Sequence, residues 1–275
     1  MQTSNPIRVC VGVPSYKGPH VDVFDRHNAF HHYLGRLQER SGIRARYPDL
    51  DLTELASLDF SGGLDPEADI RPGEPEFRFT MAVMKKNSII GQARDLTIKA
   101  AQSIEADFLL FYDDDMDFLD SVFLKLWRHR KPVVGSLAFT AREPIAPVLY
   151  RFIRKWDFAK MRERVDIRPI FDYPINKLFR VDAIGTGVVL FDMKVFKELK
   201  EPWFYGSIGS GEDVHLCWKL GHKGIPVYCD TSCKTRHVPN EHWRWMDEPY
   251  FLANLEKSKE MYEAIHAHDS DPDLS

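Results

Sequence analysis

The alternation of strand-like and helix-like segments in the first half of the chain is the feature that most restricts its fold. Short runs rich in β-branched and aromatic residues alternate with longer segments whose apolar residues recur at helical spacing. The predicted elements are strands at 7–16, 77–84, 107–112 and 132–139, and helices at 22–40, 87–106 and 121–130. A strand, helix, strand order of this kind is typical of a mainly parallel sheet with helices on its faces. The sequence therefore predicts an α/β fold.

The second half of the chain has a looser pattern, because prolines interrupt its apolar runs. Short strands are predicted within 147–153 and 165–183, and a clearer strand at 187–193. A helix at 211–224 ends on a glycine, and a strand at 225–230 follows it. A closing helix is predicted at 248–268, before an acidic tail at 269–275 that we expect to be disordered.

Composition limits the classes of partner that the chain favours. The 275 residues are 44% hydrophobic and 28% charged, which is ordinary for a soluble globular protein. The formal net charge of −4 does not favour wholesale binding to nucleic acid or to an anionic membrane. The N-terminal residues lack the basic start and long apolar stretch of a signal peptide, and no stretch reaches transmembrane length. We therefore expect a cytoplasmic protein with no membrane span.

The segment "ADFLLFYDDDMDF" (106–118) raises a chemical question, because its apolar strand ends on Asp113, Asp114 and Asp115. Crowded carboxylates repel one another, and carboxylates beside an apolar core are costly without compensation. One interpretation is a cluster that caps the next helix, since acidic groups favour a helix N-terminus. Three acids exceed what a cap needs. A divalent cation with oxygen ligands, which also binds phosphate oxygens, is the interpretation that we favour.

Two later segments carry further polar residues with chemical potential. The Gly/Ser-rich stretch "YGSIGSGEDVHLCWKL" (205–220) leads into a helix that begins with Glu212 and Asp213. Such a loop lets the backbone approach a ligand closely, although Glu212 by itself is equally compatible with helix capping. His237 follows the last predicted strand and is either a structural histidine or a group that contacts a metal or phosphate.

Taken in order, these motifs resemble those of the GT-A fold nucleotide-sugar glycosyltransferases, most closely the family 2-like members. The resemblance covers about residues 7–240 and is carried by "VGVPSY", "NSIIGQARDLTIKAA", "ADFLLFYDDDMDF", "AIGTGVVLFD", "GSGEDVHLCWK" and "RHV". It implies a single three-layer αβα domain over 1–270. A Rossmann-like nucleotide-sugar-binding half would span about 7–140, an acceptor half about 141–247, and the C-terminal helix 248–268.

The resemblance also implies roles for individual residues. Asp113 and Asp115 match the Asp-x-Asp motif, and Asp213 matches the general base of inverting members. Asp95 stands where relatives often have Asn, which puts its nucleotide contact in doubt. The complete set comprises nucleotide-sugar contacts (Pro14, Ser15, Tyr16, Arg94, Asp113, Asp114), metal ligands (Asp113, Asp115, His237), catalytic carboxylates (Asp213, Glu212) and the acceptor side (Gly185, Thr186, Gly187, Gly211).

The activity implied is transfer of a sugar from a nucleoside-diphosphate sugar to an acceptor hydroxyl, with Mn²⁺ or Mg²⁺ as cofactor and inversion as the favoured outcome. A UDP- or GDP-sugar is the expected donor, and a glycan or small molecule the expected acceptor. A nucleic-acid or virion acceptor stays open, without support from the net charge. Two alternatives remain at this level: a nucleotidyltransferase acting on a sugar phosphate, and a non-catalytic relative that binds a glycan or nucleotide.

The segment 151–168 combines basic, acidic and aromatic residues and has two interpretations. It is either an insertion that covers the acceptor site or a solvated charged face.

Overall fold

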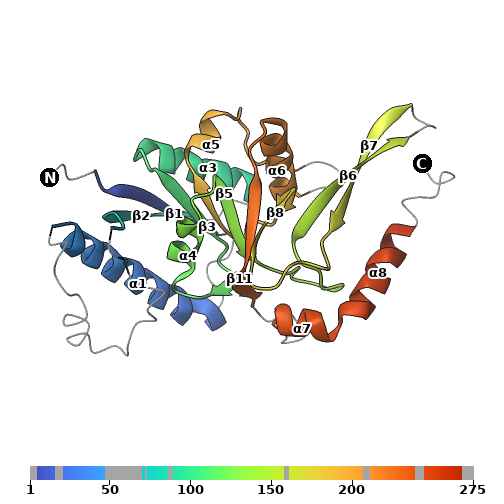
Figure 1. Cartoon of the computed structure of the whole chain (residues 1–275), viewed down its shortest axis with the longest axis horizontal. Helices are drawn as coiled ribbons and strands as arrows, with labels where there is room; N and C mark the ends of the chain where they lie inside the picture. The colour runs from blue at the N-terminus through green and yellow to red at the C-terminus, as the bar shows by residue number, and fades with distance from the viewer. Residues whose placement is uncertain are drawn as a thin grey trace.

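The structure is a computed structural model, and it describes residues 5–15, 21–46, 70–71, 73–85, 89–157, 161–206, 211–238 and 245–267. Figure 1 shows a central sheet with helices packed on both faces and a two-stranded ribbon that extends away from it. In chain order the elements are β1 (Ile7–Ser15), α1 (Val21–Arg46), β2 (Phe77–Lys85), α3 (Ile90–Ser103), β3 (Phe108–Tyr112), β4 (Met116–Phe118), α4 (Val122–Arg128), β5 (Val133–Leu137), β6 (Leu149–Asp157), β7 (Arg162–Pro169), β8 (Leu178–Val181), β9 (Ala183–Ile184), β10 (Val188–Asp192), α5 (Lys194–Lys197), α6 (Glu212–His222), β11 (Val227–His237), α7 (Glu248–Ala253) and α8 (Leu255–Ala267).

The central sheet has eight strands, in the order β2-β1-β3-β10-β5-β11-β4, with β8 paired to β11. Strands β1, β2 and β3 are parallel, as are β5 and β11, whereas β10 runs antiparallel to both β3 and β5. The five strands β1, β2, β3, β5 and β11 therefore point the same way. The predicted α/β fold with a mainly parallel central sheet is confirmed.

Alternation along the strands sends side chains into two cores, one on each face of the sheet. In β3, Leu109 and Phe111 belong to the core under α3 and α6, whereas Leu110 and Tyr112 belong to the core under α1 and α4. All four side chains are buried. Both faces are thus covered, which accounts for the nearly continuous apolar run that precedes Asp113.

Several predicted boundaries are wrong, and the differences have physical reasons. The last strand continues to His237 instead of ending at Asp230, because a register shift between Asp230 and Lys234 lets pairing resume. The closing helix is two helices, which are separated at Asn254. The acidic tail at 269–275, which we expect to be disordered, lies outside the described residues. In the described part of the chain, no helix has both the length and the apolar character needed to cross a membrane.

Candidate active site

Four of the six predicted nucleotide-contacting residues, Pro14, Ser15, Asp113 and Asp114, lie at the carboxyl ends of β1 and β3, where open α/β sheets commonly bind ligands. Pro14 and Ser15 end β1, and Asp113 follows β3 directly. The backbone N–H of Asp113 donates to the carbonyl oxygen of Gly187, 2.9 Å away, which joins the end of β3 to the loop before β10. Tyr16 lies outside the described residues.

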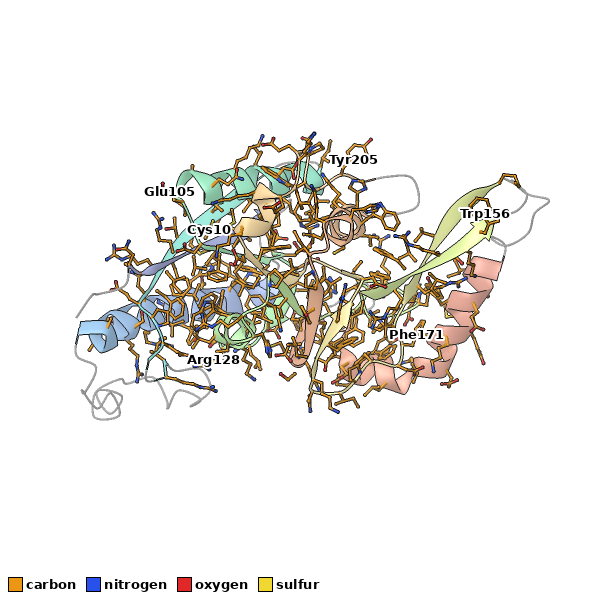
Figure 2. All side chains as sticks on the ribbon, turned by 45° about the horizontal axis from the view of Figure 1, so that its top comes forward. Cys10, Glu105, Arg128, Trp156, Phe171 and Tyr205 are labelled. Carbon is orange, nitrogen blue, oxygen red and sulfur yellow. The ribbon has the colours of Figure 1, made fainter. Side chains whose placement is uncertain are left out.

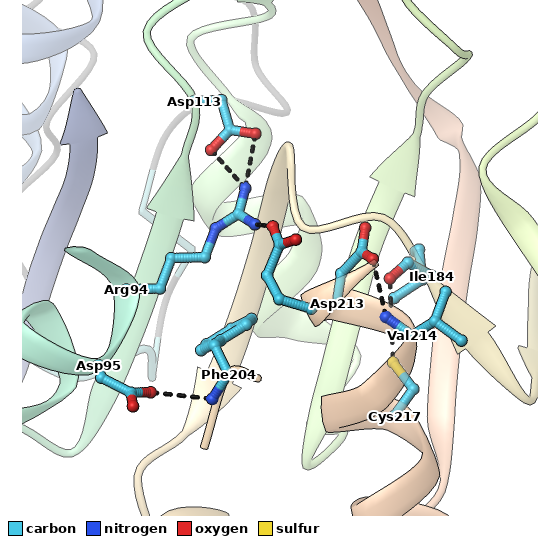
Figure 3. A network of polar contacts seen from close by, with 9 residues as sticks. Arg94, Asp95, Asp113, Ile184, Phe204, Asp213, Val214 and Cys217 are labelled. Atoms are coloured by element: carbon cyan, nitrogen blue, oxygen red, sulfur yellow. Dashed lines mark hydrogen bonds and ion pairs between the residues drawn. The ribbon is translucent and has the colours of Figure 1, made fainter. Parts of the chain in front are cut away.

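Arg94, on the first turns of α3, connects two acidic segments that are far apart in the sequence. Its Nη2 donates to both carboxylate oxygens of Asp113, at 2.8 Å each, and its Nη1 donates to Oε1 of Glu212. Figure 3 shows this guanidinium between the end of β3 and the start of α6. The Arg94 side chain is 4% exposed, and its carboxylate partners are about one fifth exposed. The predicted donor side and the predicted catalytic helix are thus held together by one buried cation.

Electrostatics favour the charged form of Arg94 strongly. Burial on its own would lower the pKa of Arg94, but the nearby carboxylates of Asp113, Glu212 and Asp213 outweigh it and raise that pKa. The guanidinium also lies over the ring of Phe204, 5.5 Å from its centroid. The acidic segments 113–115 and 212–213 therefore have a firmly charged arginine between them.

Asp95 has an internal structural role. Its Oδ1 accepts a hydrogen bond of 2.9 Å from the backbone N–H of Phe204 (Figure 3). This bond fixes the segment that supplies the ring beneath Arg94. The Asp95 carboxylate is thus engaged inside the protein, which agrees with the doubt that it contacts a nucleotide.

Asp213 lies against two glycines, Gly211 and Gly185. A Cβ atom at Gly211 would lie 2.7 Å from Asp213 Oδ1, and one at Gly185 would lie 3.6 Å from Oδ2 and 2.8 Å from Val148. The Asp213 carboxylate also accepts from the N–H of Val214, 2.7 Å away. The absence of a side chain at Gly211 therefore leaves room for the Asp213 carboxylate itself.

The pKa of Asp213 is raised, chiefly because the group is buried, while Arg94 opposes this by stabilising the carboxylate. A raised pKa brings a carboxylate closer to the range where it can accept a proton efficiently. Tyr150 also faces this group: burial, together with the charge of Asp213, raises the pKa of its phenol. Sequence reasoning missed Tyr150, because nothing in the local pattern of β6 distinguishes it from a core aromatic.

Asp115 and His237 come together across the antiparallel pairing of β4 and β11. The N–H of Val238 donates to the carbonyl oxygen of Asp115 at 3.0 Å, and His237 is the register partner of Met116. Burial, followed by the charges of Asp113 and Asp114, raises the pKa of Asp115, whereas His237 lowers it. The imidazole Nδ1 of His237 is buried and has no hydrogen-bond partner among the described residues. The buried carboxylate of Asp115 is unfavourable in its charged form, and the Nδ1 atom of His237 lacks a hydrogen-bond partner among the described residues. A cation bound between these two groups would satisfy both.

The described residues do not place three or more His, Cys, Asp or Glu side chains close enough together to enclose a metal ion. Asp113 is already bound to Arg94 through both oxygens. The arrangement fits a cation that has Asp115 and His237 as its protein ligands. Phosphate oxygens and water would take the other coordination positions, as they commonly do for Mg²⁺ in phosphate sites.

The segment after Asp115 is fixed by contacts that sequence reasoning did not assign. Asp117 is buried and pairs with Arg26, at 3.2 Å, and with Arg236. The carbonyl oxygen of Met116 accepts from His27, 2.8 Å away. The acids at 113–115 thus form a turn between two anchored strands, and they do not cap a helix.

Thr186 stands within the predicted acceptor loop between β9 and β10. Its side chain is 1% exposed, and its hydroxyl has no hydrogen-bond partner within the described ranges. The neighbouring Gly187 lies against Met116, since a Cβ atom at this glycine would be 3.3 Å from the methionine side chain. This loop therefore packs directly on the turn that carries the acids.

Comparison with known proteins gives fold-level similarities alone. No protein-family model matches the chain, and no curated protein matches it. Among solved structures, A197 from STIV aligns with a TM-score of 0.49 and 15% identity, over 88% of this chain and 94% of that one. GalNAc-T7, crystallised with UDP, GalNAc and Mn²⁺, aligns with a TM-score of 0.45 and 13% identity, over 85% of this chain and 44% of that one. Apo UDP-glucose pyrophosphorylase aligns with a TM-score of 0.39 and 12% identity, over 82% of this chain and 90% of that one. These values leave the family open, so the function must be argued from the residues of the site.

Proposed function

We propose that the protein is a metal-dependent glycosyltransferase that moves a sugar from a nucleoside-diphosphate sugar to an acceptor hydroxyl. The observation that carries the proposal is the connection of Asp113 to Glu212 through buried Arg94, with Asp213 beside it against Gly185 and Gly211. A donor-binding acid and a candidate base on opposite sides of one guanidinium suit a displacement reaction between two bound substrates.

The donor side would be built from Asp113, Asp115 and His237. Both oxygens of Asp113 accept from Arg94 and keep lone pairs for a ribose hydroxyl. Mn²⁺ or Mg²⁺ held by Asp115 and His237 would neutralise the diphosphate. The surplus of carboxylates at the site supports a need for this metal ion, since an anionic donor would otherwise meet a negative surface.

The acceptor side would be built around Asp213. Its carboxylate would take the proton of the acceptor hydroxyl while the acceptor oxygen bonds to the anomeric carbon and the bond from that carbon to the phosphate oxygen breaks. A single base opposite the leaving group favours inversion. Arg94 assists by keeping Asp213 ionised against the effect of burial.

The proposal is tested by release of nucleoside diphosphate from UDP- and GDP-sugars with Mn²⁺, with and without EDTA. We expect slow hydrolysis of one donor in the absence of acceptor, dependent on metal and lost in Asp115→Ala. Asp172→Asn is the matched control, because its side chain is 86% exposed and its carboxylate pairs with Lys259 of α8. Pyrophosphate release from a nucleoside triphosphate and a sugar phosphate, without turnover of any nucleotide sugar, would replace this function with nucleotidyl transfer.

A further inference from the structure

The β6–β7 ribbon, formed by Leu149–Asp157 and Arg162–Pro169, begins beside the candidate base and leads away from it. Leu149 and Tyr150 pair with Ile184 and Ala183 of β9, immediately before Gly185. Figure 1 shows the ribbon extending beyond the sheet, and Figure 2 places Trp156 on its outer part. Nine residues of strand span about 30 Å. A molecule that lies along the ribbon with one end at Asp213 must therefore be a polymer.

The ribbon is basic in an otherwise acidic chain. Residues 149–169 contain seven Lys or Arg and three Asp or Glu, a formal charge of +4, whereas the whole chain carries −4 and the remainder therefore −8. Separation of charge on this scale gives the ribbon as a whole a positive potential, which attracts a polyanion.

Two of these cations are placed in a way that does not help the ribbon to fold. Arg151 and Arg168 are directly opposite each other in the β6–β7 register, and like charges in that relation destabilise a strand pair. Their acidic contacts are long, 3.8 Å from Arg151 to Asp182 and 3.6 Å from Arg168 to Asp166. The two side chains are 46% and 40% exposed, so both can reach a ligand.

Apolar groups accompany the cations along the same strand. Ile153 is 42% exposed and alternates with Arg151 and Lys155 on one face, while Trp156 is 52% exposed on the other. The root of the Trp156 face packs on α6 through Phe152 and Trp218, whose rings are 5.2 Å apart. The ribbon therefore offers, near its root and on one face, two arginines that can bind phosphates bidentately. Farther out and on the other face it carries an indole on which a base can stack.

We propose that the β6–β7 ribbon binds nucleic acid and presents it to Asp213 as the acceptor polymer. A two-stranded ribbon is narrow enough to enter the major groove of a duplex, where both of its faces meet the nucleic acid, the arginines on one face and the indole on the other. The acceptor role rests on the proposed glycosyltransferase function, whereas the binding surface does not.

The test is fluorescence anisotropy of the full chain with a labelled 20-base-pair DNA duplex and with a single strand of the same sequence, between 50 and 300 mM NaCl. Arg151→Gln/Arg168→Gln keeps the 2.8 Å pair between Lys155 and Asp166. We expect this variant to lower the slope of log K against log salt by about 2 and the affinity at 100 mM salt by about 10-fold. Trp156→Ala is expected to weaken binding of the single strand.

The matched control neutralises two exposed cations at the opposite end of the sheet, Arg78→Gln/Lys197→Gln, and should bind DNA more tightly than the ribbon variant. Wild-type protein that fails to bind either DNA at 50 mM salt overturns the inference. So does a ribbon variant that binds like wild type, or tighter binding of polyglucuronate than of DNA. Asp115→Ala should lose donor turnover and keep DNA binding, so failure of the proposed function is seen separately.

Discussion

Replacement of Arg94 by methionine removes the guanidinium that joins Asp113 to Glu212 while keeping an unbranched side chain of similar length. The variant leaves two carboxylates, each about one fifth exposed, without the cation that they share. Breaking a buried ion pair by removing one partner costs about 3–5 kcal/mol in typical cases. Because both carboxylates keep some contact with water, we expect the low end, about 3 kcal/mol.

This free energy can be converted into a shift of the unfolding midpoint. Unfolding entropy is about 2.1 cal/mol/K per residue, or about 0.6 kcal/mol/K for the 275 residues of this chain. A loss of about 3 kcal/mol therefore lowers Tm by about 5 °C. Differential scanning calorimetry at pH 7.5, with EDTA present to exclude metal effects, measures this shift directly.

Two further variants identify the cause of the lowered Tm. Arg94→Met/Asp113→Asn/Glu212→Gln removes the stranded charges and should recover more than half of the lost Tm. Arg128→Met breaks a comparably buried pair with Glu74, at 2.8 Å, and should lose similar stability without weakening nucleoside-diphosphate binding. A shift below about 2 °C for Arg94→Met, or no recovery in the triple variant, would refute the electrostatic reasoning.

Four other predictions concern the carboxylates. Asp213→Asn should lower sugar transfer at least 100-fold and keep the thermal shift given by nucleoside diphosphate with Mn²⁺. Because burial raises the pKa of Asp213 above its ordinary 3.8, transfer by the wild type should decline on the acid side with a midpoint above 3.8; a rate that is flat down to pH 4 would contradict this. Asp115→Ala should abolish the rise in Tm that Mn²⁺ and nucleoside diphosphate give together, and an undiminished rise would remove Asp115 from the metal site. Asp230 has a lowered pKa, since hydrogen bonds from His129 and Ser232 outweigh the effect of burial; its stabilisation is therefore present above pH 3.8 and lost as the pH falls below it. Asp230→Asn should cost about 1–3 kcal/mol in urea unfolding at pH 7 and less at pH 3, and an equal cost at both values would contradict the sign.

The sheet was predictable from the sequence because its strands are buried on both faces and separated by amphipathic helices. Direction was harder to predict, since the apolar run at 187–193 has no feature that marks β10 as antiparallel. The extension of β11 past Asp230 was also hidden, because the polar residues that follow form a bulge and not an alternating strand. The ribbon of β6 and β7 was foreseen only as short strands, because its two faces are similarly polar.

The site was predictable as a set of strand ends, but its connections were not. Asp113 and Glu212 are 19 and 118 residues from Arg94, and no local pattern indicates that one side chain bonds to both. The same limit applies to Asp117, whose partner Arg236 is 119 residues away. Sequence indicates which residue types reach the edge of a sheet, whereas the pairing among them depends on the packing of α3 and α6.

Under the proposed function, the electrostatics of the site favour binding of metal before, or together with, the donor. A metal-free nucleoside diphosphate would approach Asp113, Asp114 and Asp115 as an anion among anions, with Arg94 already engaged. A divalent ion that binds first offsets the cost of the ionised Asp115, whose raised pKa reports an unfavourable charge. The ribbon has the opposite sign, so a polyanionic acceptor would need no metal to bind there. Donor affinity should consequently depend on Mn²⁺ and acceptor affinity on salt, two dependences that can be measured independently on the same protein.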